Sequence, residues 1–391
     1  MYSIVYVHDH KFRKIAKNNL IYSEGKFSNK VFEVFDIFDA EIFVLSRIVN
    51  VECSKELNVV DKNNLIFSPV KGVDFSKVFI IYLMKNLGIV FSLFKKSDFL
   101  VVRLPSFLGV FVLTLNLVFR KKYFIEFVGD PLDALLTSQK NPKWYFKLFA
   151  SMFAALNRFF VKNADGVIYV TQNYLQSKYP TSHLQAGVSD VEIEGLDYDF
   201  TPEVNLNEVK IALIGSFNNE YKGIDTAIKA IYELKKSNKN IHLYILGSGI
   251  LKEKYLALAV KLGVLENIHF DGSRSGGKEV ANWLKDKDIY IQPSRTEGLP
   301  RALVEAMSVG LPSIASNVGG IPELLDDQFL IDSEDYLQLA RKIQYLLDSD
   351  VLYKNQSQMN YLKAKEYTYN TLQQKRLDFW LKAKQIIDLE H

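Results

Sequence analysis

The chain has 391 residues, of which 48% are hydrophobic and 24% charged, and it contains a single cysteine. These values fit a globular protein of two or three domains, and one cysteine excludes an internal disulfide. Residues 107–119 are apolar but too few to span a membrane, and no signal peptide is evident, so we expect a cytoplasmic protein.

Charge is unevenly distributed along the chain. Residues 1–180 carry 24 Lys and Arg against 15 Asp and Glu, and residues 181–391 carry 24 against 30, so a net charge of +3 conceals a basic half and an acidic half. Two such halves are expected to meet different partners. An anionic lipid surface is a candidate partner of the basic half, whereas nucleic acid is not expected because no nucleic-acid-binding motif is present.

The first half alternates predicted strands and helices, as in a doubly wound α/β sheet. Strands are predicted at residues 3–8, 40–45, 99–104, 123–128 and 166–170. Asp9, His10 and Lys11 are predicted to end the first of them. Between the first two strands, Gly25 lies in a loop that either faces an acceptor or forms an ordinary surface turn.

Asp130 and Pro131 follow the fourth predicted strand. Asp130 is either a polar residue on the acceptor side, able to take a proton, or part of an Asp-Pro turn or helix cap. The sequence leaves both interpretations open.

Residues 143–162 combine basic and aromatic side chains over about five helical turns. A helix that lies on an anionic membrane has this composition. So does a core helix whose Lys and Arg side chains reach along its apolar surface to water. Both interpretations are kept, and membrane contact would account for the positive charge of the first half if the acceptor were lipid-linked.

A polar, acidic stretch at residues 188–206 separates the two halves. We therefore predict an N-terminal domain over residues 1–190 and a C-terminal domain over residues 205–370. The stretch contains Asp197-Tyr198-Asp199, a D-x-D pattern that holds a metal ion in some enzymes. A single such pair in an acidic linker is weak evidence, and no metal site is predicted.

The α/β pattern restarts in the second half. A strand at residues 209–214 is followed by the turn Gly215-Ser216, and Lys222 precedes a helix. A lysine at a helix start is disfavoured by the helix macrodipole by ~0.3–1 kcal/mol, which favours a functional reason for Lys222 over a simple surface role. Later in this half, a strand at residues 268–272 leads to Arg274.

The most informative stretch begins with a β-branched and aromatic strand at residues 289–292. A loop with Arg295 and Glu297 follows, and Gly298-Leu299-Pro300 then offers backbone N–H groups at the start of a helix. Such groups suit a diphosphate or a sugar oxygen.

The helix that follows begins at Arg301 and carries Glu305 among apolar residues. An unpaired charge is costly there, so we expect Glu305 to have a partner, for which ribose hydroxyls are suitable. Gly310-Leu311-Pro312 ends the helix, and a second strand leads to Gly319-Gly320.

Glu297 and Glu305, with seven residues between them, resemble the E-x7-E motif of the retaining glycosyltransferases of family four, within glycosyl transferases group 1. The flanking residues extend the resemblance through Pro293-Ser294, Gly310-Leu311-Pro312 and Gly319-Gly320-Ile321-Pro322-Glu323. The ordered combination is far more specific than two glutamates alone.

The resemblance implies a GT-B fold, α/β with two Rossmann-like domains facing each other across a cleft, and a helix at about residues 371–391 that packs back onto the first domain. It implies a retaining, metal-independent enzyme of the hexosyltransferase class without a cofactor, which moves a sugar from a nucleotide diphosphate sugar to a glycan or lipid-linked acceptor. The expected pathway is cell-surface polysaccharide synthesis. The expected location is the cytoplasm or the inner face of the cell membrane.

The resemblance also assigns roles to residues of this sequence. Glu297 positions the sugar hydroxyls, Lys222 neutralises the leaving diphosphate, and Glu305 holds the ribose. The expected acceptor-side residues are Gly25 and Asp130. The other expected donor-binding residues are Gly215, Ser216, Arg274, Arg295, Gly298, Leu299, Pro300 and Arg301.

Two positions depart from the family pattern. Val128 stands where a histidine is often found, and Ser216 stands where an arginine is usual. We expect Arg295 or Arg301 to supply the missing charge. The alternative functions are another GT-B sugar-nucleotide enzyme, such as an epimerase, and a catalytically silent scaffold.

Overall fold

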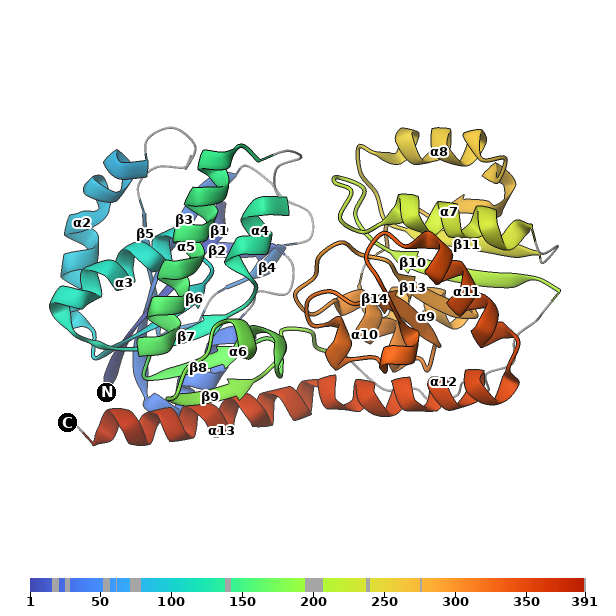
Figure 1. The fold of residues 1–391 in the computed structure, drawn as a ribbon. Coiled ribbons are helices and arrows are strands. Elements are labelled where there is room, and N and C mark those ends of the chain that lie inside the picture. Colours follow the sequence, from blue (N-terminus) through green and yellow to red (C-terminus); the bar gives the residue numbers. More distant parts are fainter. Residues whose placement is uncertain are drawn as a thin grey trace. The chain divides into compact units, whose positions relative to one another are not determined.

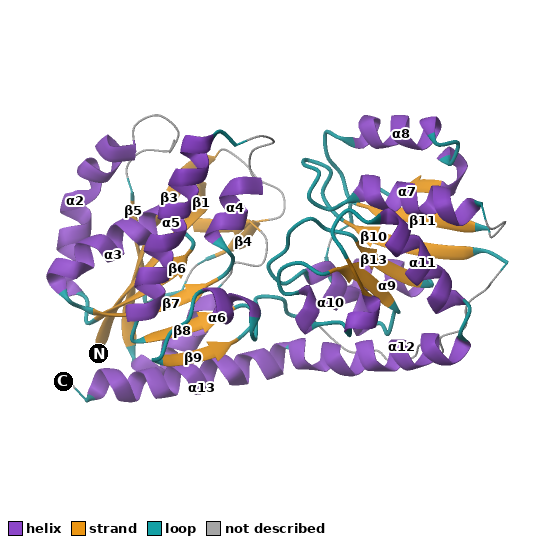
Figure 2. Ribbon diagram, in the orientation of Figure 1, coloured by secondary structure: helices purple, strands orange, loops and turns teal. Residues whose placement is uncertain are grey.

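The computed structural model describes residues 1–15, 21–24, 29–51, 57–60, 62–70, 79–137, 142–193, 207–236, 240–274 and 276–389. The chain divides into two compact units (Figure 1). Unit 1 comprises Met1–Val188 and Gln373–His391, and unit 2 comprises Ser189–Leu372. Both units consist of a sheet covered by helices (Figure 2).

Unit 1 contains a nine-stranded sheet. Its strands are β1 Tyr2–Ile15, β2 Ile21–Glu24, β3 Ala40–Val51, β4 Leu57–Val59, β5 Leu65–Pro69, β6 Phe99–Leu104, β7 Lys122–Phe127, β8 Gly166–Tyr169 and β9 Leu184–Gly187. Its helices are α1 Lys30–Glu33, a 3-10 helix at Val34–Phe38, α2 Phe79–Lys96, α3 Phe107–Phe119, α4 Pro131–Thr137, α5 Trp144–Asn163, α6 Tyr174–Lys178 and α13 Tyr369–Asp388.

The parallel strands of unit 1 follow the order β5-β3-β1-β6-β7-β8-β9, with β2 and β4 added in antiparallel fashion. Through β8 this is the order of a doubly wound sheet, in which the chain reverses direction across the sheet between β1 and β6. Ligands of such sheets bind beyond the carboxyl ends of the strands at that switch point. Unit 1 therefore has a candidate binding edge where β1 and β6 separate.

The prediction that Asp9, His10 and Lys11 end the first strand is wrong. β1 continues to Ile15, but its pairing with β3 shifts, because Val7 lies opposite Leu45 while Lys11 lies opposite Arg47. Two extra residues of β1 are thus accommodated around His8, Asp9 and His10. Such a bulge redirects side chains and is common beside active sites.

Helices α2, α3 and α5 cover one face of this sheet and share a core with β1, β6 and β7. The other face carries an aromatic cluster that the C-terminal helix α13 completes. Trp380 of α13 is 1% exposed, and its ring centroid lies 4.8 Å from that of Phe35 and 5.4 Å from that of Phe124. Residues more than 250 positions apart thereby share one core.

Unit 2 contains a six-stranded parallel sheet in the order β12-β11-β10-β13-β14-β15. Its strands are β10 Val209–Ile214, β11 Ile241–Leu246, β12 Ile268–Phe270, β13 Ile289–Gln292, β14 Ser313–Ser316 and β15 Leu330–Ile331. Its helices are α7 Ile224–Lys235, α8 Lys252–Lys261, α9 Lys278–Lys285, α10 Arg301–Ser308, α11 Tyr336–Leu347 and α12 Asp350–Ala364, with 3-10 turns at Leu265–Asn267, Ile321–Glu323, Asp327–Phe329 and Lys365–Tyr367.

The sheet of unit 2 is buried on both faces, as expected for parallel strands. Ile211 and Ile291 face the core with α7, α8 and α11, while Ala212 and Tyr290 face the core with α9 and α10. The switch point lies between β10 and β13. The predicted strands at residues 209–214 and 289–292 are confirmed at both ends.

Within the described residues, none of the helices has the length and apolar character needed to traverse a lipid bilayer.

Candidate active site

The loops after β10 and β13 meet at the switch point of unit 2. Ile211 pairs with Ile289 and Ala212 with Tyr290, so the carboxyl ends of both strands lie at the same edge of the sheet. The backbone N–H of Arg295, in the loop after β13, donates to the carbonyl of Tyr221, in the loop after β10. The predicted site residues of the two loops are therefore close neighbours.

Lys222 and Glu297 form an ion pair at this edge. Lys222 Nζ lies 2.7 Å from Glu297 Oε1, and the two side chains are only 13% and 9% exposed. The lysine stem passes against Gly215, where an added Cβ would approach Lys222 Cγ to 2.8 Å. Gly215 thus leaves room for the lysine to reach the carboxylate.

A buried series of polar side chains also holds Glu297 in place. Gln292 Nε2 and Ser294 Oγ donate to the same Oε1 at 2.9 and 2.7 Å, and Tyr290 OH donates to Gln292 Oε1. No residue that the structure describes donates to the other carboxylate oxygen of Glu297, Oε2. Three donors on one oxygen fix the side chain and leave Oε2 for a ligand.

The environment of Tyr290 shows that this series of side chains is shielded from water. Its side chain is fully buried, and burial, with the charge of Glu297 as a smaller cause, raises the pKa of its hydroxyl well above the ordinary value. The hydroxyl therefore remains a proton donor to Gln292 at any physiological pH.

Sequence reasoning did not assign roles to Tyr290, Gln292 and Ser294. Because side chains alternate along a strand, these three residues share one side of β13 and its extension. The sequence did contain a signal for these residues, because polar side chains occur at every second position of a strand that is otherwise apolar.

Two glycines hold the loop of Glu297 in place. Gly319 has φ +59°, and a Cβ there would lie 1.9 Å from the Glu297 carbonyl oxygen. Gly223 has φ +65°, and a Cβ there would lie 1.8 Å from the carbonyl oxygen of Pro293. No other residue type combines this conformation with such close backbone approach. The loops after β10, β13 and β14 are thus packed backbone to backbone.

Glu305 has the partner that its place on α10 requires, but that partner is a protein group. Arg301 Nε donates to Glu305 Oε1 at 2.8 Å, one helical turn away. Glu305 is 16% and Arg301 36% exposed, so both side chains are open to a ligand from solvent.

Arg295 is engaged within unit 2. Its guanidinium donates to both carboxylate oxygens of Asp225, at 2.9 and 3.1 Å, to Glu334 Oε1 at 2.5 Å, and to the carbonyl of Glu220. These contacts make Arg295 a residue that ties the loop after β13 to the start of α7. Of the two arginines expected to replace the charge missing at Ser216, Arg301 is the more exposed, at 36% against 23%.

The remaining donor-side residues occupy the same edge with weaker contacts. Ser216 Oγ accepts from the backbone N–H of Asn218 at 3.3 Å. The carbonyl of Gly298 accepts from Gly320 N at 2.7 Å, Leu299 packs against the core, and Pro300 precedes the first residue of α10. Arg274 lies exposed after β12, and no contact joins it to the other predicted site residues.

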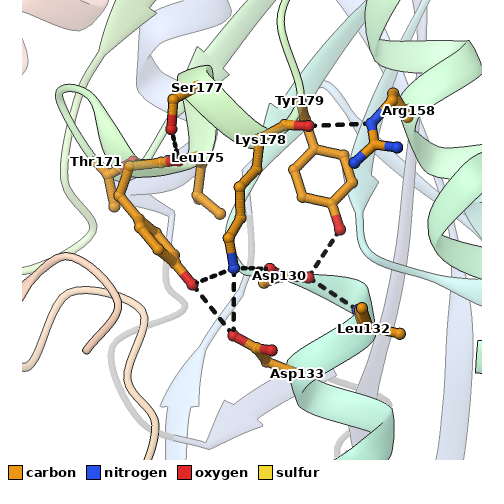
Figure 3. A network of polar contacts seen from close by, with 10 residues as sticks. Asp130, Leu132, Asp133, Arg158, Thr171, Leu175, Ser177, Lys178 and Tyr179 are labelled. Carbon is orange, nitrogen blue, oxygen red and sulfur yellow. Dashed lines mark hydrogen bonds and ion pairs between the residues drawn. The ribbon is translucent and has the colours of Figure 1, made fainter. Parts of the chain in front are cut away.

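Asp130 of unit 1 belongs to a dense network of polar contacts (Figure 3). Its Oδ1 accepts from the Leu132 backbone N–H at 2.9 Å and from Tyr179 OH at 2.7 Å, while Lys178 Nζ lies 2.8 Å from Oδ2. Burial by itself raises the pKa of this carboxyl, but the hydrogen bonds from Lys178 and Tyr179 outweigh it and lower the pKa.

The geometry of Asp130 therefore supports the helix-cap interpretation. A carboxylate with donors on both oxygens and a lowered pKa is a poor proton acceptor near neutral pH. The other predicted acceptor-side residue, Gly25, lies outside the described residues, as does Asp197-Tyr198-Asp199.

A different group of polar residues lies at the switch point of unit 1, on the bulge of β1 and its neighbours. Arg103 NH1 pairs with Glu126 Oε2 at 3.0 Å, and Tyr6 OH donates to the same oxygen at 2.7 Å. Burial, followed by the charges of Arg103, His10 and Arg47, lowers the pKa of His8 well below its ordinary value. The sequence analysis assigned no site role to His8 or His10.

Comparison with known proteins identifies the family to which the chain belongs. A family model described as Glycosyl transferases group 1 matches residues 197–365. The sequence is 32% identical to Protein CapJ of Staphylococcus aureus over 98% of this chain and 96% of that protein. The chain belongs to the glycosyl transferases of group 1.

Two further comparisons bear on this glycosyltransferase. Over 144 residues, 34% of this chain and 35% of that protein, it is 32% identical to the Escherichia coli K12 glycosyltransferase WcaL, named for colanic acid biosynthesis. The structure of Anabaena HepE in complex with UDP and glucose is similar, with a TM-score of 0.62 at 15% identity, over 96% of this chain and 98% of that one. Likeness at this level shows the fold, and the predicted GT-B fold is confirmed.

Proposed function

We propose that this glycosyltransferase is a retaining, metal-independent enzyme of family four and of the hexosyltransferase class, which takes its sugar from a nucleotide diphosphate sugar. The observation that carries the proposal is the Lys222–Glu297 pair, shielded from water at the switch point of unit 2 and placed between the starts of α7 and α10. A cation and two helix N-termini at one edge form a site for a diphosphate.

Lys222 is the counter-charge of the leaving diphosphate. When the bond between the anomeric carbon and the diphosphate oxygen breaks, negative charge grows on that oxygen. The lysine is held 2.7 Å from Glu297 before the donor arrives, so it needs little reorganisation to share its charge with the diphosphate. The backbone N–H groups at the start of α10, with Arg301, complete the anion site.

Glu297 positions the sugar. Its Oε1 already accepts hydrogen bonds from Lys222, Gln292 and Ser294. Its Oε2 accepts hydrogen bonds from hydroxyl groups of the transferred sugar. Glu305 accepts from the ribose hydroxyls and keeps Arg301 in place. The acceptor oxygen attacks the anomeric carbon on the face that the diphosphate leaves, and its proton passes to the departing diphosphate oxygen.

The acceptor-binding role falls to unit 1 in this proposal. His8, Arg103 and Glu126 occupy its switch point, where a doubly wound sheet binds its ligand, and they offer both donors and acceptors for sugar hydroxyls. The name of WcaL supports a glycan or lipid-linked acceptor in cell-surface polysaccharide synthesis. We place the reaction in the cytoplasm, at the inner face of the cell membrane.

A thermal-shift screen against UDP, GDP, ADP and dTDP, with and without a chelator, tests the donor site. A ligand that binds only the folded state raises the melting temperature with its concentration. The UDP complex of HepE leads us to expect the largest shift with UDP, unchanged by the chelator and abolished by Glu305→Ala. Glu266→Ala, an exposed glutamate elsewhere in unit 2, is the matched control.

Two results would contradict the proposal. If no nucleotide stabilises the wild type, the donor site is wrong and a catalytically silent scaffold becomes the favoured function. If nucleotide binds but NMR of the product shows an inverted anomeric configuration or an epimerised free nucleotide sugar, the retaining transfer is wrong while the donor site stands.

A further inference from the structure

The apolar surface of helix α5 exceeds what its packing uses. One side of the helix is buried in the core of unit 1 through Ala150, Phe153, Ala154, Asn157, Phe160 and Val161. Seven large hydrophobic side chains nevertheless remain exposed on the same helix: Trp144 (76%), Tyr145 (55%), Leu148 (54%), Phe149 (46%), Met152 (59%), Leu156 (44%) and Phe159 (47%).

These seven residues form a continuous stripe. Successive residues of a helix are about 100° apart, so positions 144, 145, 148, 149, 152, 156 and 159 fall in one sector beside the buried side. A core helix that merely extends its basic side chains to water does not leave such a stripe uncovered. The structure shows α5 as a core helix that also has a second, exposed apolar side.

The charges around the stripe have one sign. α5 contains no Asp or Glu, and Lys147 and Lys162 lie at the margin of the stripe, with Lys143 directly before the helix. All three lysines are exposed, and none of them forms an ion pair with another residue that the structure describes. Trp144 and Tyr145 lie at the N-terminal end, and both residue types favour the boundary between lipid and water.

We infer that this stripe, residues 144–159 of α5, docks the protein on an anionic lipid bilayer. The stripe enters the boundary between headgroups and acyl chains, and the three lysines contact anionic headgroups. A symmetric pairing of two copies through the stripe would bring the lysines of both copies together, which the charge pattern disfavours. The inference rests on the proposed function only in that a lipid-linked acceptor is reached from the membrane surface.

Tryptophan fluorescence and vesicle sedimentation test the inference. The chain has three tryptophans, and Trp283 and Trp380 are 5% and 1% exposed, so a change at the surface is reported by Trp144. With vesicles of phosphatidylglycerol and phosphatidylcholine at about 0.1 M salt, we expect sedimentation and a blue shift of emission. Vesicles of phosphatidylcholine alone, or about 1 M salt, should bind much less protein.

Two sets of variants locate the contact. The triple variant Leu148→Gln, Met152→Gln, Leu156→Gln should lower vesicle binding by about tenfold or more per side chain, since each loses its transfer into lipid. Its matched control is Val351→Gln, Met359→Gln, Leu362→Gln on α12, three residues that are 69%, 66% and 48% exposed in unit 2. Lys143→Gln, Lys147→Gln and Lys162→Gln should each weaken binding about fivefold.

The inference is overturned if the wild type does not sediment with the anionic vesicles, or if the α5 triple variant binds them as well as the α12 control. It is also overturned if the α5 variant turns a dimer into a monomer without changing vesicle binding. UDP-induced thermal stabilisation, measured on the same samples, keeps the test separate from that of the donor site. If the UDP-induced shift of the melting temperature is intact but the protein does not bind the vesicles, membrane docking is wrong and the proposed transfer still stands.

Discussion

The two units share the strand order of a doubly wound sheet, but different residues and backbone packing form their switch points. In unit 2, three loops are packed backbone to backbone through Gly223 and Gly319, and a carboxylate with three donors on one oxygen is buried between them. In unit 1, the corresponding edge contains a bulge in β1 and the side chains of His8, Arg103 and Glu126, of which Arg103 and Glu126 are 16% and 15% exposed. The edge of unit 2 is built from closely packed backbone around one carboxylate, whereas the edge of unit 1 carries several polar side chains on an irregular strand. In our proposal, the first edge binds the donor and the second binds the acceptor.

The largest expected effect comes from removing the positive charge of the Lys222–Glu297 pair in unit 2. Lys222→Ala removes the cation that stabilises the leaving diphosphate, and we expect turnover to fall by about 10²–10³-fold, or roughly 3–4 kcal/mol. Turnover is measured as release of nucleotide from nucleotide sugars that carry the base identified in the thermal-shift screen. Lys229→Ala, which removes a 42%-exposed lysine of α7, should change turnover less than about twofold. Near-normal turnover of Lys222→Ala with intact folding would refute its catalytic role.

Gly319→Ala breaks the backbone packing of the same edge. A methyl group would meet the Glu297 carbonyl oxygen at 1.9 Å at a positive φ, so we expect a loss of about 2–4 kcal/mol of stability and weaker UDP binding. Thermal unfolding with and without UDP measures both. Gly276→Ala meets no atom within 4 Å and should be close to neutral. Equal behaviour of the two variants would show that the loop tolerates rearrangement.

Arg103→Met tests whether the two edges act separately. It leaves the Glu126 carboxylate, 15% exposed, with Tyr6 as its remaining partner, and should cost about 1–3 kcal/mol of stability. We expect weaker acceptor binding and slower transfer, but an unchanged nucleotide-induced shift of the melting temperature, because the proposed donor site lies in unit 2. Arg120→Met, at an exposed position of unit 1, is the control. Loss of the UDP shift would contradict the separation.

Asp130→Asn should have the smallest effect, about 1–2 kcal/mol, since Lys178 is 41% exposed and solvent weakens the pair. The folded state lowers the pKa of Asp130, so its stabilising contribution is present above the unfolded pKa of about 4 and is lost as pH falls below it. Urea unfolding at pH 7 and at pH 3 measures the difference between wild type and variant. A difference that does not shrink at the lower pH would show that charge is not its cause.

The sequence predicted unit 2 better than unit 1 for a physical reason. Glu297, Glu305 and Lys222 lie in short local motifs, and the strands before them, Val209–Ile214 and Ile289–Gln292, are predominantly apolar. The partners of Arg295 lie 70 and 39 residues away along the chain, and no local pattern indicates that Asp225 and Glu334 occupy its guanidinium.

In unit 1, the resumption of β1 after its bulge was missed because His8, Asp9 and His10 look like the end of a strand. Their polarity is that of a turn, but beyond the bulge β1 pairs with both β3 and β2, and this pairing keeps the chain extended. The polar side chains behind Glu297 were missed for a related reason, since a buried strand predicts apolar packing and Gln292 departs from it at its last residue.

Helix α13 links the completion of unit 1 to the order of protein synthesis. Trp380 and Phe379 close the aromatic face of unit 1, yet they leave the ribosome only after Ser189–Leu372, the whole of unit 2. At about 5–20 residues per second, the nascent first unit waits roughly ten to forty seconds with Phe35, Phe38 and Phe124 uncovered. The segment translated first therefore completes its core only when the last helix has been made, and until then these rings lie exposed on the nascent chain.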